Sequence, residues 1–309
     1  MTLVASDLIE RINTAKNFTQ VFENGRGLDE WKTSYIEMAK ILHPDICKEG
    51  GAHEALSKLN HLKDFMEQGI PLNDEVGEIR THYNKIVIKG DKKFIDRSHQ
   101  NYTVLVGLKE DSAKNFQRYL PQNVIYPAFA PGSPDQGSYQ IELKDPAVPL
   151  AHLIPPVDQK HVNWIVSRMI ELAGWFRQIG YTHGGMTPHS IFVVPKTHGI
   201  ICTTFYHMTK LGNPMNTVSG PFATFYPAKL FTAKKATMDI DVEMAKRIGI
   251  YLLGDKSGNG TILRKSPNIN QPMLAVLQRY QQDPYLAFKE YRSTLEKEFK
   301  KEFIPMEDY

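Results

Sequence analysis

Cysteine and long apolar runs are scarce in this sequence. Only two cysteines, Cys47 and Cys202, occur in 309 residues and they form no pattern, which argues against a structural disulfide and for a reducing compartment. No apolar run approaches the ~20 residues of a membrane-spanning helix. The N-terminus, MTLVASDLIERI, lacks the basic and then apolar layout of a signal peptide. We therefore expect a cytoplasmic protein.

The sequence also lacks a large excess of charge of either sign. The formal net charge is +3 and charged residues make up 23% of the chain, so neither nucleic acid nor a membrane is expected as a partner. Three histidines near one another in the sequence, His183, His189 and His207, have no Cys, Asp or Glu at metal-ligand spacing. We expect no metal and no cofactor.

The tripeptide His43-Pro44-Asp45 separates two amphipathic helical patterns near the N-terminus. In 27–42, the apolar side chains form one helical stripe: Trp31, Tyr35, Met38, Ala39 and Leu42. In 50–66, a second stripe follows the same rule: Ala52, Leu56, Leu59, Leu62 and Met66. Helices of similar length joined by a short loop pack antiparallel, so these stripes should face each other and the loop should stand in solvent.

The first 67 residues resemble the J domain of DnaJ-type co-chaperones. Besides the tripeptide, the matching features are Tyr35, Ala39, Asn60, the segment NFTQVF (17–22), and a short first helix with Leu8, Ile9 and Ile12. The resemblance implies that His43, Pro44 and Asp45 engage a DnaK-type ATPase chaperone and accelerate its ATP hydrolysis, which traps a client protein.

The charge of the second J-domain helix departs from that family, in which a basic face meets an acidic surface of the chaperone. Here the helix carries only Lys32 and Lys40, offset by Glu30 and Glu37. These two lysines are the expected additional chaperone contacts, and long-range steering should be weak. A decoy, which occupies the chaperone without delivering a client, is therefore an alternative function.

The residues after 70 predict a larger domain with a sheet part and a helical part. The expected division is a J domain (1–70), a connector (71–82), a small lobe (83–150) and a large lobe (151–309). In the small lobe we expect a hairpin turning at Gly90-Asp91, a buried strand over 102–108, a short helix over 111–120, and a hairpin from 123–130 to 138–144. In the large lobe we expect helices over 157–180, 239–254, 271–283 and 283–303, and strands at 190–194 and 199–205.

The segment YTHGGMTPHSIFV (181–193) resembles the catalytic loop of protein kinases, H-R-D-L-x-P-x-N followed by a strand. His183, Met186 and Pro188 match the His, Leu and Pro of that loop. Three further segments resemble later landmarks of the family, in the same order: ICTTFYH (201–207) the strand leading to D-F-G, FATFYPAKLF (222–231) the end of the activation segment, and Asp239 the Asp of the next buried helix.

The groups that phosphoryl transfer needs are missing from this loop. Gly185 stands at the position of the base Asp, Thr187 at the adjacent Lys, Ser190 at the metal-binding Asn, and Thr204 at the Asp of D-F-G. No G-x-G-x-x-G precedes the first predicted hairpin. At the position of the ATP-binding Lys, the predicted third strand has Val106, or Lys109 if the register is shifted. Neutral hydroxyls do not replace carboxylates as magnesium ligands. The resemblance therefore implies a pseudokinase with no catalytic residues; an atypical nucleotide-dependent transferase is the alternative.

The expected fold is an all-α J-domain helical hairpin followed by an α+β protein-kinase-like fold, with a small antiparallel sheet lobe and a larger helical lobe. This arrangement resembles bacterial proteins in which a J domain is fused to a kinase-like domain. The kinase-like domain would bind the client or a partner protein.

Overall fold

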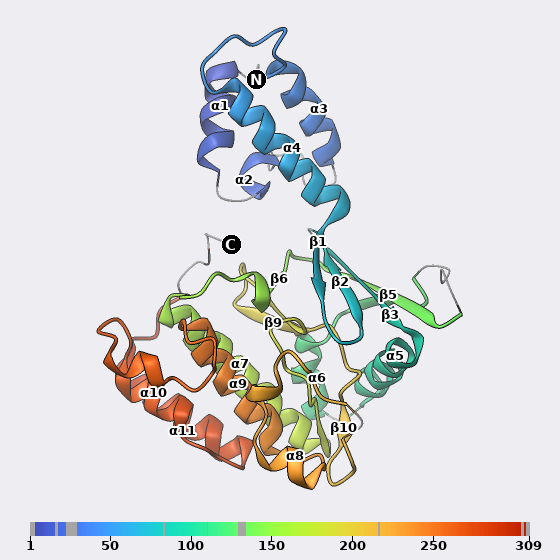
Figure 1. The fold of residues 1–309 in the computed structure, drawn as a ribbon, viewed down its shortest axis with the longest axis vertical. Coiled ribbons are helices and arrows are strands. Elements are labelled where there is room, and N and C mark those ends of the chain that lie inside the picture. Colours follow the sequence, from blue (N-terminus) through green and yellow to red (C-terminus); the bar gives the residue numbers. More distant parts are fainter. Residues whose placement is uncertain are drawn as a thin grey trace. The chain divides into compact units, whose positions relative to one another are not determined.

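The computed structural model describes residues 4–15, 18–22, 30–82, 84–109, 111–128, 134–215, 217–303 and 306 (Figure 1). Contacts divide the chain into two compact units after Ile70. Unit 1 ends at Ile70 and unit 2 runs from Pro71 to Met306. The chain combines helices with a small antiparallel sheet, so the mixed α and β class expected from the sequence is confirmed.

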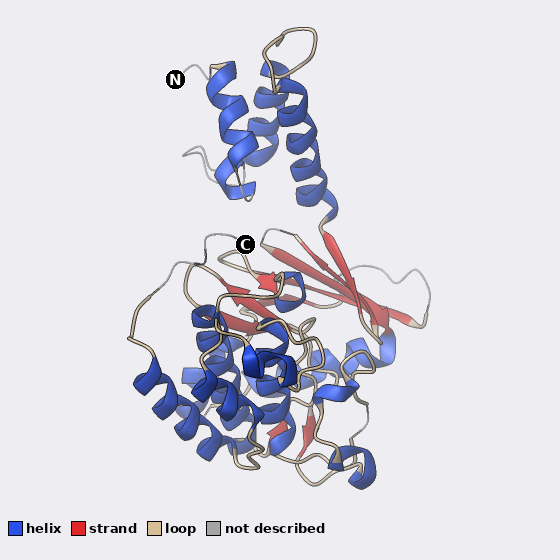
Figure 2. Cartoon of the chain, turned by 60° about the vertical axis from the view of Figure 1, so that its left-hand side comes forward, coloured by secondary structure: helices blue, strands red, loops and turns tan. Residues whose placement is uncertain are grey.

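Unit 1 is helical, as Figure 2 shows. Its described elements are α1 (Ala5–Thr14), α2 (Phe18–Phe22), α3 (Trp31–Ile41) and α4 (Ala52–Gln68). The core is formed by fully buried apolar side chains from all four helices and the turn after α3: Leu8, Ile12, Val21, Phe22, Met38, Leu42, Ala55 and Leu59. The two predicted stripes and the short first helix are confirmed, and residues 23–29 lie outside the described part.

The pairing of α3 with α4 rests on this core and on one polar contact. Tyr35 Oη donates to Asn60 Oδ1 at 2.9 Å, which ties the middle of α3 to the middle of α4. Gly51, before α4, has φ +84° and a position where a Cβ would approach Ile9 Cγ2 to 3.2 Å. A glycine there lets the chain enter α4 close to α1.

Unit 2 contains a five-stranded antiparallel sheet in the order β1-β2-β3-β5-β4. The strands are β1 (Ile70–Asn73), β2 (Gly77–Thr81), β3 (Lys85–Asp91), β4 (Asn123–Ile125) and β5 (Gln136–Glu142). One face is apolar because alternate residues of paired strands lie on it: Ile79 is opposite Ile88, and Ile88 is opposite Tyr139. Helix α5 (Lys92–Val106) packs on this cluster through Ile95, which is fully buried. The predicted pairing of 123–130 with 138–144 is confirmed for β4 and β5.

Three of our predictions in this region are wrong. The connector 71–82 is part of the sheet, because β1 and β2 form around a turn in which the Asp74 carboxylate accepts from the backbone N–H groups of Val76 and Gly77. Gly90-Asp91 is no hairpin turn: Asp91 caps α5 by accepting from Lys93 N at 2.8 Å. The segment 102–108, predicted as a strand, is therefore the end of that helix, and its β-branched residues are outweighed by the cap and by burial of one helical face.

The rest of unit 2 is mainly helical, and its central helix is α7 (Gln159–Gln178). Around it lie α9 (Asp239–Leu252), α10 (Gln271–Gln278) and α11 (Pro284–Glu298). Short elements complete the unit: α6 (Asp111–Phe116), η2 (Gln117–Tyr119), β6 (Val148–Pro149), η3 (Leu150–His152), β7 (Tyr181–Thr182), β8 (Ile191–Val194), β9 (Gly199–Cys202), β10 (Thr209–Lys210), η4 (Ala223–Phe225), α8 (Lys229–Ala233) and η5 (Thr261–Lys265). The predicted helices of this region, the short helix within 111–120 and the strands at 190–194 and 199–205 are confirmed, with shifted ends. None of the described helices is both long and apolar enough to span a membrane.

Candidate functional site

The loop His43-Pro44-Asp45 follows α3 and is held by its own backbone. The carbonyl of His43 accepts from Ile46 N at 2.8 Å and from Cys47 N at 2.9 Å, while Leu42, one residue earlier, is buried in the core. The loop is thus a fixed turn on a rigid helix pair, although its side chains face solvent.

All three side chains of this turn are exposed, and those of His43 and Asp45 expose 55% and 87% of their surface. Asp45 N donates to His43 Nδ1 at 3.2 Å, which requires the neutral ring to carry its proton on Nε2. The Asp45 carboxylate lies 3.4 Å from the same Nδ1 and forms an ion pair only when the ring is protonated. Lys48 Nζ donates to Pro44 O at 2.5 Å. The turn therefore presents an imidazole and a carboxylate side by side.

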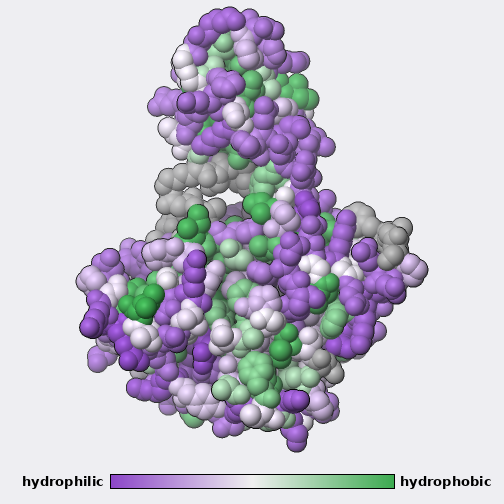
Figure 3. All heavy atoms as spheres, in the orientation of Figure 1, coloured by the Kyte–Doolittle hydropathy of each residue, from purple (hydrophilic) through white to green (hydrophobic). Residues whose placement is uncertain are grey.

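An apolar surface lies next to this turn. Ile36 and Ile46 are 50% and 70% exposed, and they line a hollow of about 310 Å³ together with Tyr35, Ala39, Lys40 and His43. Figure 3 shows hydrophobic atoms at the surface over α3, among hydrophilic neighbours. Of the two predicted lysine contacts, Lys40 borders the hollow and Lys32 does not. Apolar rather than basic side chains dominate the surface beside His43.

The kinase-like loop of unit 2 (183–190) is buried and held by a carboxylate of α9. Asp241 Oδ2 accepts from His183 N at 2.7 Å, and Oδ1 accepts from Gly184 N at 2.8 Å. Burial raises the pKa of Asp241 to about 6, although these two backbone donors oppose the rise. Asp239, which the sequence matched to the kinase Asp, forms no hydrogen bond with the described residues of this loop and is bonded to Lys229 and Tyr280.

The position of the kinase base, Gly185, is occupied by a neighbouring ring. A Cβ on Gly185 would lie 2.2 Å from His207 Cδ2, so no side chain fits there while His207 keeps its place. His183 lies nearby and is also buried, which lowers the pKa of its imidazole to about 3. Gly185 therefore brings no side chain to the position of the base, and the buried imidazole of His183 is a weak base.

The hydroxyl groups that replace the metal-binding residues are used inside the loop. Ser190 Oγ donates to Gly185 O at 2.6 Å and accepts from Thr187 N at 2.9 Å. Thr204 is 1% exposed, and the strand end before it joins the loop because Thr203 N donates to Ser190 O at 3.0 Å. The structure brings these residues together, but as a packed internal network.

A turn between β1 and β2 closes over this loop; we name Asp74–Val76 the acidic turn. Glu75 Oε1 lies 2.7 Å from His207 Nε2, and Glu75 Oε2 accepts from Ser219 Oγ at 3.1 Å. Tyr206 donates its hydroxyl hydrogen to Asp74. Burial alone would raise the pKa of Glu75, but the hydrogen bond and the charge of His207 outweigh it and leave the pKa below its ordinary value. The acidic turn thus places two carboxylates beside the residues that pack against the loop.

The residue predicted for the ATP-binding Lys is also wrong. Val106 ends α5 and Lys109 follows that helix, so neither lies on a strand. The third strand of the sheet, β3, does carry a lysine, Lys89, and its side chain is exposed. The helix after it, α5, contains Asp96 but no Glu. Asp96 pairs with Lys92, at 2.6 Å.

Sequence reasoning missed the residues that fix the site: Asp74, Glu75, Tyr206, His207, Ser219 and Asp241. A local signal existed for the acidic turn only, because Asn73-Asp74-Glu75-Val76-Gly77 has the composition of a tight turn. Within the described residues, no group of three or more His, Cys, Asp or Glu side chains has the geometry of a metal site. Cys47 and Cys202 are both buried thiols.

No protein-family model matches this sequence, and no curated protein matches it.

Proposed function

We propose that this chain is a J-domain co-chaperone that stimulates a DnaK-type ATPase chaperone, and that its second unit is a catalytically inactive kinase-like domain that binds a client or partner. The observation that carries the proposal is the rigid, exposed His43-Pro44-Asp45 turn at the end of the antiparallel α3 and α4 pair. Its side chains are free to contact another protein, and the helices beneath it keep the turn in one conformation.

Inactivity of the second unit is supported by the geometry of its buried loop. Gly185 has no room for a base, Ser190 is bonded within the loop, and Thr204 is buried. The acidic turn adds two carboxylates near this loop, one of them paired with His207, and carboxylates repel the phosphates of a nucleotide bound beside them. These features favour the inactive domain over the transferase alternative.

The surface around His43 supports a contact that depends little on salt. The exposed Ile36 and Ile46 contribute apolar area, whereas Lys40 is the one lysine that borders the hollow. Apolar contacts are not screened by ions, but contacts between exposed charges are. Stimulation should therefore fall only slightly between low and physiological salt.

The test is single-turnover ATP hydrolysis by a DnaK-type chaperone in the presence of the full-length chain. We expect stimulation by the wild type and none by His43→Gln, with His61→Gln, the same change at an exposed residue of α4 away from the turn, as the matched control. Equal stimulation by wild type and His43→Gln would contradict the proposal. Stimulation without retention of a client by the chaperone would instead favour the decoy.

A further inference from the structure

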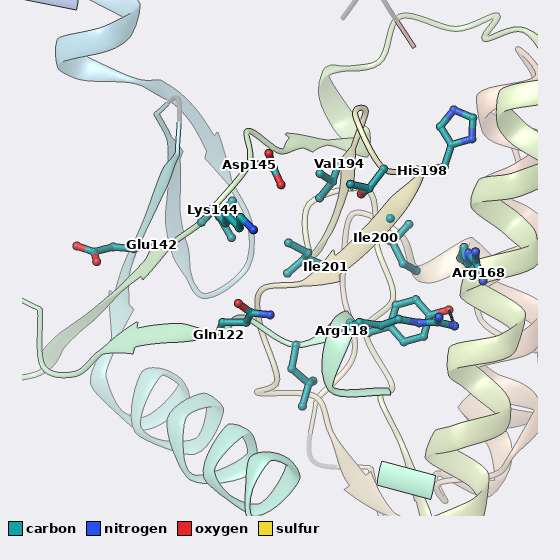
Figure 4. A pocket seen from close by; sticks show the side chains of 15 residues that line it. Arg118, Gln122, Glu142, Lys144, Asp145, Arg168, Val194, His198, Ile200 and Ile201 are labelled. Atoms are coloured by element: carbon teal, nitrogen blue, oxygen red, sulfur yellow. Dashed lines mark hydrogen bonds between the residues drawn. The ribbon is translucent and has the colours of Figure 1, made fainter. Parts of the chain in front are cut away.

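A cavity of about 340 Å³ lies in unit 2, lined by the segment around η2, the end of β5, one residue of α7 and the β8–β9 hairpin (Figure 4). Its volume is within the range of ~300–1,000 Å³ typical of ligand sites. None of its lining residues belongs to the loop 183–190 or to the acidic turn. The cavity is therefore separate from the kinase-like site.

The floor of the cavity is apolar. It is formed by aliphatic side chains from four segments of the chain: Leu120, Leu143, Val194, Ile200 and Ile201. Ile200 and Leu143 are buried, whereas Ile201 is half-buried and also packs against the core of the five-stranded sheet. Strand β9, which carries both isoleucines, is at the edge of its three-stranded sheet. An extended segment of another protein can lie along such an edge, with one apolar side chain on the floor.

One wall of the cavity is held in place by a shared carboxylate. Arg118 Nη2 donates to Glu171 Oε1 at 3.2 Å, and Arg168 Nη1 donates to Glu171 Oε2 at 3.0 Å. Their side chains are 55% and 40% exposed. A guanidinium has five N–H donors, so each arginine is oriented by Glu171 and keeps donors for a second anion.

The other charges at the rim leave the cavity positive. Lys144 lines it and has no ion-pair partner among the described residues, whereas Asp145 is paired with Lys196 at 2.9 Å. Glu142 accepts from Asn123 and Gln140, and Figure 4 shows it directed away from Arg118 and Ile201. The exposed donors at the rim are therefore cationic, and they flank an apolar floor.

We propose that this cavity binds an extended protein segment in which apolar side chains are flanked by acidic residues. An apolar side chain of the segment contacts Ile201, and its carboxylates accept from Arg118 and Lys144. The proposal rests on the proposed function only in naming this segment as part of the client; the binding itself follows from the cavity.

The experiment measures fluorescence anisotropy of a labelled short peptide, Glu-Glu-Leu-Phe-Glu-Glu between Gly-Ser ends, titrated with the full-length chain. We expect saturable binding that weakens by at least about tenfold in the variant Arg118→Gln plus Lys144→Gln, because charge-assisted hydrogen bonds are lost. Ile201→Thr should also weaken binding, since it keeps a β-branched residue in β9 but removes apolar area. Lys256→Gln, an exposed lysine outside the cavity, is the matched control.

A peptide with Lys in place of Glu should bind at least about tenfold more weakly. The proposal is overturned if no saturable binding occurs below about 1 mM, if the Lys peptide binds equally well, or if the double variant binds like the wild type. Should the double variant melt at a lower temperature, Lys144→Gln alone provides the test, because no described residue forms an ion pair with Lys144 that the change would remove. No chaperone is present in this assay, so its failure is distinct from a failure to stimulate ATP hydrolysis.

Discussion

The turn 43–45 and the loop 183–190 both carry a family motif, but they use their side chains in opposite ways. In the first, the imidazole of His43 and the carboxylate of Asp45 are exposed on a rigid helix pair. In the second, the side chains of His183, Thr187 and Ser190 are buried and bonded within the protein. A motif supports a function in contact with another molecule only when its side chains remain free; otherwise it supports the packing of the fold.

The largest expected effect tests the scaffold of the exposed turn. Leu59 is fully buried in the unit 1 core, so Leu59→Ala should lower the free energy of unfolding by about 2–5 kcal/mol. His43→Gln, on the surface, should change it by less than about 0.5 kcal/mol. Hydrogen exchange of the backbone amides of α3 and α4 in the full chain, which reports on the unfolding of unit 1, measures both. If His43→Gln also lowered the free energy of unfolding by several kcal/mol, His43 would be part of the scaffold and not a surface residue of the turn.

A somewhat smaller effect is expected in the buried loop. Gly185→Ala places a methyl group where His207 Cδ2 would lie 2.2 Å away, and such overpacking costs about 1–3 kcal/mol. Gly220→Ala, at a glycine with no atom within 4 Å of the new Cβ, is the matched control. Thermal unfolding compares the melting temperatures of the two variants. Equal values would show that His207 moves aside without a cost in stability.

The acidic turn gives a pH-dependent effect. The pKa of Glu75 is lowered in the folded state, so its contribution to stability is fully present above its ordinary value of 4.5 and is lost as the pH falls through the lower folded value. Glu75→Gln should cost about 1–2 kcal/mol at pH 6, because a charged hydrogen bond is lost. Denaturation at pH 6 and pH 3.5 should show this difference shrinking in acid; a constant difference would contradict the role given to Glu75.

The smallest expected effect is the absence of any change in melting temperature when ATP and magnesium are added. A ligand that binds only the native state raises the melting temperature by mass action, so millimolar ATP with magnesium should be visible if it binds well. We expect no magnesium-dependent shift, because Gly185, Ser190 and Thr204 supply neither base nor metal ligand and the acidic turn repels phosphates. A clear shift that disappears on mutating Lys89 would favour the transferase alternative.

The sequence predicted the helices best where their periodicity was regular. The stripes of α3 and α4 and the long α7 were found because the apolar spacing of each continues over several turns. Residues 102–108 were misread as a strand because Thr103, Val104 and Val106 favour strands locally, whereas the cap at Asp91 and the burial of Ile95 and Leu105 decide for a helix. Propensity is a weak guide when a cap and tertiary packing oppose it.

The contacts of the buried loop could not be predicted from local patterns. Asp74 and Glu75 meet partners 132 to 144 positions later in the chain, and no spacing rule connects residues so far apart. The choice between Asp239 and Asp241 likewise depends on which carboxylate points at His183, and both are buried in the same helix. The exposed turn was easier, because a loop between two helices ends in solvent for topological reasons alone.

The contact between Gly185 and His207 sets the order in which this loop could be redesigned. An engineer who wished to install a carboxylate at position 185 would first have to remove the ring of His207. That removal would leave the carboxylate of Glu75 without its closest partner, so Glu75 would need replacement in turn. A single substitution at position 185 therefore requires two further changes, first at His207 and then at Glu75.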